Sequence, residues 1–599
     1  MTQSILTNPQ ELETWLDDFM SEQMSKLHVP GVTFYLVQNS ELFFTKGYGY
    51  ANLEQQIPVV ADKTLFRVGS ISKLFTATAI MQLVEKELVN LNDDVNKYLR
   101  DFQLENNYPK PVTIANLLTH TAGLDDRLVG TFTSDANKLV PLGEHLAATM
   151  PKRVMLPGEV ISYSNYGYAL LGYVAELVSG KPFKQYVSEH ILQPLEMHHS
   201  SFARPCSFAN DLSIGYQYQP KDNYQAWSCQ YDLIPPASSL STTATDIAKF
   251  AIAHLQYGKY KSSRILKENT ARQMQQQQFT HDSRLPGICW GFIESWYNQQ
   301  LAIQHGGEMP GFTSLLYLFP NHDLGLFISS NNTSRIHKHL LEHFCDRYLP
   351  VEKSTISGKS SSGALRSLKR YRGSYRNNRY SRHTIDKTNL LGTPTLNLKV
   401  ASNGSLNISN FNNPKSEYLE IKPLLLQLQT DIGERSERRF IAREENGRIT
   451  ALLTNIEVWE RLSWYETKVF HWTLIALFLL IFLSGFVVSI FFLAKFPGTW
   501  QHQLSYLVES IVCGLNLMFL VGMLAIDPLM LEVPKKVILL LCLPLVTCVL
   551  AATLPVFAVL AWMNSEWSAI EQLYYSFVSL TALCFIPFLS YWNLLGFRY

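Results

Sequence analysis

The C-terminal part of the chain is dominated by four long apolar runs, at residues 469–494, 504–526, 537–563 and 573–595. A helix needs about 20 apolar residues to cross the hydrocarbon core of a bilayer, and each run is long enough to do so. The pattern therefore predicts four transmembrane helices within residues 468–595, and it makes a lipid bilayer a partner of the chain.

Few polar or helix-bending residues interrupt these runs. Glu509 and Asn516 lie in the second run, and Pro544 and Pro555 lie in the third. An acidic residue near a helix end can reach the lipid headgroups, and we interpret Glu509 in this way rather than as part of an ion or proton path. A membrane transport unit would carry several inward-facing charges, which the runs lack.

The first 350 residues have the mixed pattern of a soluble domain. Scattered apolar and acidic positions in residues 1–28 predict an amphipathic helix, and residues 32–37 and 42–45 are short β-prone runs that predict a hairpin. After Ser70, apolar residues recur at helical spacing. They are Leu74, Ala77, Met81 and Val84.

Two further segments precede the apolar runs. Residues 351–364 are rich in serine, glycine and lysine, which is typical of a solvated linker. Residues 365–463 alternate short β-like runs with turns, so a small β-barrel or a curved sheet is expected. This segment has no reactive cluster, and we interpret it as a spacer. The predicted domains are residues 1–350, the linker at 351–364, the β domain at 365–463 and the helices at 468–595.

Composition narrows the possible partners. The 599 residues carry a formal net charge of +1 and 17% charged residues, without a basic stretch that contains interleaved aromatics. We therefore predict no nucleic-acid partner. The eight cysteines form no Cys-x-x-Cys pair, so neither a zinc site nor a disulfide framework follows from them.

A candidate nucleophile lies at the start of the helical period. Ser70 is followed by Lys73, and a helix places residues three apart on one face. A lysine amine at that distance can activate a serine hydroxyl, and free amides at a helix N-terminus favour developing negative charge. The pair predicts acyl transfer, and its alternative is an ordinary helix start with an exposed lysine.

Two later segments supply further polar groups. Tyr163 and Asn165 stand just before a helical period. The phenol could exchange a proton with the serine if Lys73 depresses its pKa, and the carboxamide could hold a substrate amide. Taken singly, the two residues also fit a half-buried aromatic and an N-cap. His305 precedes paired glycines that let a backbone approach a ligand, so it is either a polar or cationic wall of the site or a structural residue.

With Ser-x-x-Lys, Tyr-x-Asn and His-x-Gly in this order, the chain resembles the serine beta-lactamase and penicillin-binding-protein superfamily. Its nearest branch is the class C beta-lactamase-like or S12 peptidase-like hydrolases. The resemblance covers about residues 10–345 and includes residues 117–124, 157–158, 236–244 and 310–312. It implies an α/β (α+β) domain in which helices flank an antiparallel sheet. The β domain that follows resembles the lipocalin-like domain appended to some of these hydrolases.

The resemblance also implies roles for single residues. Ser70 would be the acylated nucleophile and Lys73 the activating amine. Tyr163 would be the proton shuttle, and Asn165 would contact a substrate amide. No metal or organic cofactor is required for this chemistry.

The third motif departs from the pattern of the enzymes that act on penicillins. Those enzymes carry Lys-Thr/Ser-Gly, whose lysine helps to hold the substrate carboxylate, whereas this chain has His305, Gly306 and Gly307. The next residue, Glu308, would join Ser70 in supplying the backbone amides of an oxyanion hole. His-x-Gly variants in the superfamily include D-aminopeptidases and esterase-like hydrolases, so the reaction class is predicted more firmly than the substrate.

The predicted function is that of a membrane-anchored serine hydrolase. Its substrate would be a small molecule or peptide with an amide or ester bond, such as a D-amino-acid peptide, a beta-lactam or an ester. The alternative is a non-catalytic membrane sensor that uses the pocket only to bind, although a pure binder has no need of Ser70, Lys73 and Tyr163 together. The sequence does not determine the oligomeric state.

Basic residues near the ends of the apolar runs predict the orientation. Five lie on the side of the hydrolase domain and one lies on the other side, namely Arg461, Lys468, Lys535, Lys536 and Arg598 against Lys495. The positive-inside rule then places the hydrolase domain in the cytoplasm. No signal peptide is visible in residues 1–28, which agrees. The extracytoplasmic face is the alternative, because relatives that act on cell-wall peptides face outward.

Overall fold

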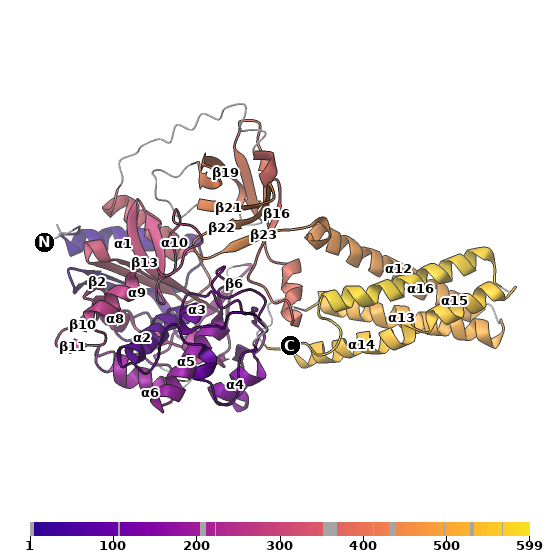
Figure 1. The fold of residues 1–599 in the computed structure, drawn as a ribbon, viewed down its shortest axis with the longest axis horizontal. Helices are drawn as coiled ribbons and strands as arrows, with labels where there is room; N and C mark the ends of the chain where they lie inside the picture. Colours follow the sequence, from indigo (N-terminus) through magenta and orange to yellow (C-terminus); the bar gives the residue numbers. More distant parts are fainter. Residues whose placement is uncertain are drawn as a thin grey trace. The chain divides into compact units, whose positions relative to one another are not determined.

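The computed structural model describes the chain apart from ten short stretches: residues 1–4, 106–107, 204–210, 222, 351–367, 411–412, 430–438, 496–497, 527–531 and 566. The predicted linker at residues 351–364 lies outside the described residues. Two compact units are present (Figure 1). The first comprises Met1–Asp126, Phe132–Arg379 and Leu396–Arg461, and the second comprises Arg127–Thr131, Tyr380–Thr395 and Leu462–Tyr599.

The first unit is built on a seven-stranded antiparallel sheet. Its strand order is β12 (Ile293–Tyr297), β13 (Gln300–Met309), β14 (Phe312–Phe319), β15 (Leu324–Ser330), β1 (Gly31–Gln38), β2 (Glu41–Asn52) and β3 (Ile57–Pro58). The predicted hairpin is β1 and β2. Strand β1 also pairs with β15, with Val32 opposite Ser330 and Gln38 opposite Leu324. The start of the domain is thereby joined to its end.

Helices cover both faces of this sheet. All eight residues of β1 are buried, because Phe34 and Leu36 pack in one hydrophobic cluster while Tyr35 and Val37 pack in another. The first cluster includes residues of α1 (Pro9–Lys26) and α10 (Ile336–Tyr348), and the second includes residues of α2 (Ser72–Glu85), α5 (Asn165–Ser179) and α8 (Ala244–Leu255). The predicted fold of helices flanking an antiparallel sheet is confirmed.

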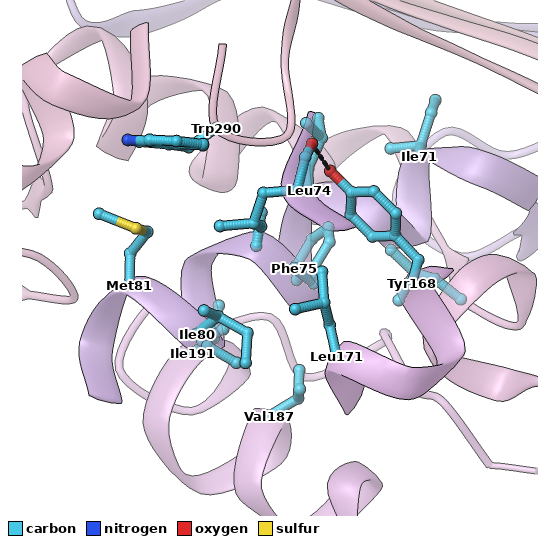
Figure 2. Packing of buried hydrophobic residues seen from close by; sticks show 14 of the residues in the cluster. Ile71, Leu74, Phe75, Ile80, Met81, Tyr168, Leu171, Val187, Ile191 and Trp290 are labelled. Carbon is cyan, nitrogen blue, oxygen red and sulfur yellow. Dashed lines mark hydrogen bonds between the residues drawn. The ribbon is translucent and has the colours of Figure 1, made fainter. Parts of the chain in front are cut away.

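The contact between α2 and α5 fixes the position of the candidate nucleophile. In Figure 2, Leu74 and Phe75 of α2 point toward Tyr168 and Leu171 of α5. The Tyr168 hydroxyl donates to the Leu118 carbonyl oxygen at 2.9 Å, which satisfies the one polar atom that its fully buried ring carries. The two helices therefore pack against each other through buried apolar side chains.

The remaining elements of the domain that contains the antiparallel sheet are short. The helices are α3 (Ile114–Leu118), α4 (Leu142–Ala148), α6 (Phe183–Val187), α7 (Pro235–Ser238) and α9 (Glu268–Gln275). The strands form four two-stranded pairs: β4 (Phe66–Arg67) with β9 (Ser241–Thr242), β5 (Phe132–Thr133) with β8 (Tyr231–Asp232), β6 (Tyr216–Gln219) with β7 (Asn223–Ala226), and β10 (Lys259–Tyr260) with β11 (Ser263–Arg264).

The predicted small β domain is a closed eight-stranded barrel. Its strands follow one another in order: β16 (Gly373–Asn377), β17 (Leu396–Val400), β18 (Leu406–Asn410), β19 (Asn413–Lys422), β20 (Leu425–Leu428), β21 (Arg439–Glu445), β22 (Arg448–Leu453) and β23 (Val458–Arg461). Pairing of β16 with β23 closes the barrel. Closure removes the exposed sheet edges, which would otherwise be free to pair with other chains.

The barrel packs directly against the domain that contains the antiparallel sheet. Val160 and Leu285 of that domain form an apolar cluster with Leu425 and Ile441 of the barrel. Polar contacts border this cluster. The Asn378 amide donates to the Ile161 carbonyl oxygen at 3.0 Å, and the Arg284 guanidinium donates to the Pro423 carbonyl oxygen at 3.0 Å. His281 Nδ1 also lies 2.9 Å from the Thr454 carbonyl oxygen.

The second unit contains four helical spans that are long and apolar enough to cross a membrane. They are Lys468–Lys495 (α12), Trp500–Leu524 (α13), Lys535–Met563 (α14 at Lys535–Ala551 and α15 at Leu554–Met563) and Ala569–Tyr591 (α16). Their mean hydropathies run from 1.6 to 2.9, and less than half of each span is buried inside the unit. The helices therefore present apolar surface outward, as lipid-facing helices do.

Glu509 lies inside this helical unit. Its side chain is fully buried, and the Ser489 hydroxyl of α12 donates to its Oε2 at 2.6 Å. Asn516, two turns further along α13, is buried as well. The interpretation of Glu509 as a residue that reaches the headgroups is wrong, because packing of α13 against α12 turns its carboxyl inward.

Cys229 is disulfide-bonded. The cysteine spacing did not predict this bond. Sequence spacing cannot reveal which cysteines meet in space, because that depends on how distant segments pack.

Candidate active site

Ser70 lies in a single 3₁₀ turn, Gly69–Ile71, immediately before α2. The sequence pattern predicted Ser70 at the start of the helix, and the turn places it two residues before Ser72, the first residue of α2. Gly69 has a φ of +54°, and a Cβ there would lie 3.1 Å from the backbone nitrogen of Glu308. A glycine at this position therefore allows the turn to lie tightly against β13.

Lys73 projects from the first turn of α2 into the protein interior. Its side chain is fully buried, and its Nζ lies 3.0 Å from Ser70 Oγ. The same nitrogen donates to Asn165 Oδ1 and to the Ala237 carbonyl oxygen, each at 2.8 Å. The predicted alternative of an exposed lysine does not describe this side chain.

The electrostatics of this pocket favour an uncharged Lys73. Burial lowers the pKa of the amine well below its usual range, the positive charge of Arg379 lowers it further, and Asp232 opposes the shift. A neutral amine has two N–H donors and one lone pair. With both donors on Asn165 and Ala237, the lone pair faces Ser70, so the serine hydroxyl can donate to the amine.

Tyr163 lies beside this pair. Lys73 Nζ is 5.0 Å from the centroid of the phenol ring. We expected the amine to depress the pKa of the phenol, and that expectation is wrong. Burial raises the pKa of Tyr163 to about 12, and this effect outweighs a hydrogen bond with Ser70 and the charge of Arg379, which act in the opposite direction. Tyr163 is therefore a neutral phenol at physiological pH.

Asn165 is the first residue of α5 rather than its N-cap. The cap is Ser164, whose hydroxyl oxygen accepts a hydrogen bond from the Gly167 amide at 3.0 Å. The carboxamide of Asn165 is consequently not needed for capping. It holds Lys73 instead, which links the N-terminus of α5 to that of α2.

His305 is buried on β13 and is uncharged. Its Nδ1 lies 2.7 Å from the Gly306 carbonyl oxygen, so Nδ1 carries the hydrogen. Burial lowers the pKa of His305 to about 3. A buried, uncharged ring does not fit the predicted cationic wall, and the polar wall and the structural residue both stay predictions.

The glycines after His305 allow β13 to lie against the nucleophile turn. A Cβ on Gly307 would lie 1.9 Å from the Val68 carbonyl oxygen and 3.3 Å from the Ser70 nitrogen, whereas a Cβ on Gly306 would meet its nearest atom only at 3.8 Å. Only Gly307 is therefore required by close approach. Glu308 follows with an exposed side chain, and its backbone nitrogen borders the turn that carries Ser70.

Sequence reasoning missed His120. Its ring stacks on Tyr163 at a centroid distance of 4.1 Å, and its Nδ1 accepts a hydrogen bond from the Ser164 amide at 3.0 Å. Burial lowers the pKa of His120 well below its usual range, so the ring is neutral. The sequence did contain one signal for His120, because this residue lies within residues 117–124, a segment that supported the family resemblance.

Arg379 was also missed. It follows the first barrel strand, and its Cζ lies 4.7 Å from the centroid of the Tyr163 ring. Its Nε lies 3.2 Å from Asp126 Oδ2. No sequence signal pointed to it, because only the packing of the barrel on the catalytic domain brings residue 379 close to residue 163.

These features define a class of protein. An antiparallel sheet is covered by helices, with a serine in the turn before one helix and a lysine in that helix's first turn. A tyrosine and an asparagine lie at the start of a second helix, and such an arrangement can support serine acyl transfer. The chain belongs to the Beta-lactamase family, whose sequence profile matches residues 16–342.

Known proteins support this assignment. The chain is 28% identical to Protein flp of Staphylococcus aureus (strain MW2), over 56% of this chain and 66% of that protein. It is 29% identical to the putative penicillin-binding protein PbpX of Bacillus subtilis (strain 168), over 47% of this chain and 66% of that protein. The chain thus spans slightly less than two thirds of the length of these relatives.

The fold resembles that of a solved structure titled SurE. The TM-score is 0.54 with 19% sequence identity, and the alignment covers 76% of this chain and 99% of SurE. A second structure, of SurE with D-Leu, gives a TM-score of 0.51. The aligned share is larger than residues 16–342, so the likeness in fold extends beyond the family match.

Proposed function

We propose that the chain is a serine hydrolase that cleaves a small amide or ester through an acyl-enzyme on Ser70. One observation carries this proposal. The buried Lys73 amine lies 3.0 Å from Ser70 Oγ, and its two other contacts are oxygen acceptors. This arrangement directs a lone pair at the serine hydroxyl, which is what a general base requires.

Acylation begins when Ser70 Oγ attacks the substrate carbonyl carbon and Lys73 takes the hydroxyl proton. The backbone amides of Ser70 and Glu308 donate to the developing oxyanion. Tyr163, a neutral phenol, then gives its proton to the leaving group and regains one from Lys73. Asn165 offers its amide nitrogen to a substrate carbonyl group, while its Oδ1 keeps Lys73 in place.

Deacylation repeats these transfers in reverse with water as the nucleophile. Tyr163 and Lys73 take the proton of the attacking water and return a proton to Ser70 Oγ, so that serine and amine end as they began. His120 and His305 remain neutral throughout and form polar walls that hold the ring of Tyr163 in position.

The substrate class follows from the family and from the third motif. D-amino-acid peptides, esters and beta-lactams are the candidates, and SurE, which shares the fold, has been crystallised with D-Leu. D-amino-acid esters and amides are therefore the first substrates to test, with penicillin as a probe of the beta-lactam branch.

We further propose that the four helical spans anchor the enzyme in a membrane. The charge distribution predicts a cytoplasmic catalytic domain. The disulfide at Cys229 favours the opposite face, because disulfides seldom persist in the cytosol. A cysteine placed at the exposed Glu41 distinguishes the two. Labelling of intact cells by an impermeant maleimide, above that of the parent chain, would place the domain outside. Labelling only after permeabilisation would place it inside.

The serine hydrolase proposal is tested by intact-protein mass spectrometry of the detergent-purified chain after treatment with a fluorophosphonate probe. We expect one probe adduct on the unaltered protein and on Ser21→Ala, an exposed control on α1, and none on Ser70→Ala. A penicillin adduct would add the beta-lactam branch. If the folded, unaltered protein forms no adduct with either reagent, the hydrolase proposal fails and a purely binding role takes its place.

A further inference from the structure

The β-barrel places a positive charge at the edge of the Ser70 site. Arg379 lies just after β16, and its guanidinium carbon stands 4.7 Å from the centre of the Tyr163 ring. Its side chain is 38% exposed, so solvent and small solutes reach it. A guanidinium over a tyrosine face is also attracted by the ring, which favours this position.

The backbone that carries Arg379 is fixed to both domains. Asn378 is 1% exposed, its amide side chain donates to the Ile161 carbonyl oxygen at 3.0 Å, and its backbone nitrogen donates to the Val458 carbonyl oxygen at 2.8 Å. Ile161 precedes Tyr163 by two residues, and Val458 begins the last barrel strand. The arginine is therefore held in register with the catalytic tyrosine.

The guanidinium is only partly used by the protein. Its Nε pairs with Asp126 Oδ2 at 3.2 Å. Within the described residues, its two terminal nitrogens make no hydrogen bond to a protein atom. Asp126 thus contacts the Nε side of the guanidinium. The two terminal nitrogens carry parallel N–H groups, and these can bind a planar anion.

The other positive or titratable groups around the site cannot take this role. Lys73 is fully buried and already makes three contacts. His120 and His305 are buried and neutral. Among the described residues that surround Tyr163, Arg379 is left as the accessible permanent cation.

We propose that Arg379 binds a carboxylate of the substrate, so that a residue of the barrel sets the preference of the catalytic domain for anionic acyl donors. The inference rests on the proposed serine hydrolase function and deepens it. A bidentate Arg–carboxylate pair fixes both distance and orientation, which would align the scissile bond with Ser70. The barrel is then a part of the substrate site as well as a packing partner.

The test uses the full chain in detergent and two ester substrates that are identical except that one has a free carboxylate where the other has the primary amide. The variants are Arg379→Gln, Arg379→Lys and, as a control, Arg448→Gln at an exposed position of β22. We expect Arg379→Gln to lower kcat/KM for the carboxylate substrate about 10- to 100-fold. Each variant is compared on the plateau of its own pH profile, because Arg379 also acts on the pKa of Lys73. There the amide substrate should stay within about threefold, and the change should fall mainly on KM.

The two other variants sharpen the result. Arg379→Lys should keep part of the preference, because the charge remains while the fork is lost. Arg448→Gln should leave both substrates unchanged. Equal losses on the two substrates would show that Arg379 is merely structural, and an unchanged preference would show that the carboxylate binds elsewhere. Either result overturns the proposal, and turnover of the neutral substrate reports that each variant is folded.

A failure of the inference is separable from a failure of the hydrolase function. If the fluorophosphonate probe labels Ser70 but the carboxylate preference does not change in the Arg379 variants, only the proposed role of Arg379 is refuted. If Ser70 is not labelled, calorimetric binding of the carboxylate and amide compounds to Ser70→Ala, with and without Arg379→Gln, decides the inference by itself. A carboxylate affinity that does not depend on Arg379 would refute it.

Discussion

The Nζ of Lys73 lies 2.8 Å from the carbonyl oxygen of Ala237, a residue 164 positions away in the chain. This contact, together with the one to Asn165, keeps the amine from rotating away from Ser70. Because both partners are oxygen acceptors, they take up two N–H groups of the amine and leave its third position to the serine. The amine is thus oriented by tertiary contacts.

Loss of this amine should abolish most of the reactivity of Ser70. Lys73→Met removes the amine with little change in volume, and we expect acylation by the fluorophosphonate to slow about 10²- to 10⁴-fold, the usual contribution of a general base. Stopped-flow or timed mass spectrometry measures the rate. Lys97→Met, at a side chain that is 64% exposed, is the matched control and should acylate normally. A reactive Lys73→Met protein would exclude Lys73 as the base.

The pH dependence of acylation should report the state of Lys73. Burial lowers the pKa of this amine, so the reactive neutral form accumulates as pH rises through a value well below the ordinary lysine value of about 10.4. The rate should rise with pH along one limb and then level off. Tyr163, with a pKa of about 12, should stay protonated across that range and add no second limb below it.

A single isosteric substitution should shift the pH at which the acylation rate rises. Asn165→Asp puts a carboxylate beside Lys73 Nζ, where the carboxamide oxygen lies at 2.8 Å. The negative charge stabilises the ammonium form and raises the pKa of Lys73, so the midpoint of the profile should shift to higher pH. Arg379→Gln removes a positive charge and should shift it in the same direction. A midpoint that is unchanged in both variants would assign the limb to another group.

Gly307 and Gly306 offer a matched pair of adjacent glycines. Gly307→Ala would drive a Cβ to 1.9 Å from the Val68 carbonyl oxygen, so β13 must move away from the nucleophile turn. We expect a loss of roughly 1–3 kcal/mol in the free energy of unfolding and a drop of about 10²-fold or more in acylation rate. Gly306→Ala has open space and should change neither. Denaturant unfolding and probe kinetics, run on both, test this asymmetry.

Asn378 should connect the barrel to the active site. Asn378→Ala leaves the Ile161 carbonyl oxygen without its donor, which should cost about 1–3 kcal/mol in the free energy of unfolding of the first unit. Because Arg379 is the next residue, kcat/KM for a carboxylate substrate should fall more than for its neutral amide. Asn223→Ala, at an exposed position on β7, serves as control. Equal effects on the two substrates would mean that Asn378 does not position Arg379.

Several features could be predicted because they depend on local sequence. The four apolar runs, the first hairpin and the alternating β pattern of residues 365–463 all appear as helices or strands. Ser70 and Lys73 meet because three-residue spacing in a helical turn brings them together, whatever the rest of the fold does. The family resemblance rested on such short motifs, and the match to the Beta-lactamase family confirms it.

Other features depend on which distant segments come together. The inward position of Glu509 and the neutral state of His305 follow from burial, and burial is set by the packing of elements that lie far apart in the chain. The same holds for the raised pKa of Tyr163, which sequence reasoning expected to be lowered. Local sequence shows which groups can titrate, but the sign of a pKa shift depends on how far the fold removes them from water.

The sequence by itself thus determined the domain types, the apolar spans, and the candidate nucleophile with its candidate base. Each of these depends on residues within a single helical turn or a single periodic run. Tertiary structure alone decided that Lys73 is held between Asn165 and Ala237, that His120 supports Tyr163, and that Arg379 arrives from the barrel. The physical reason is that a hydrogen bond, a ring contact or a desolvated charge depends on proximity in space. Proximity between residues 163 and 379 exists only once the two domains have packed.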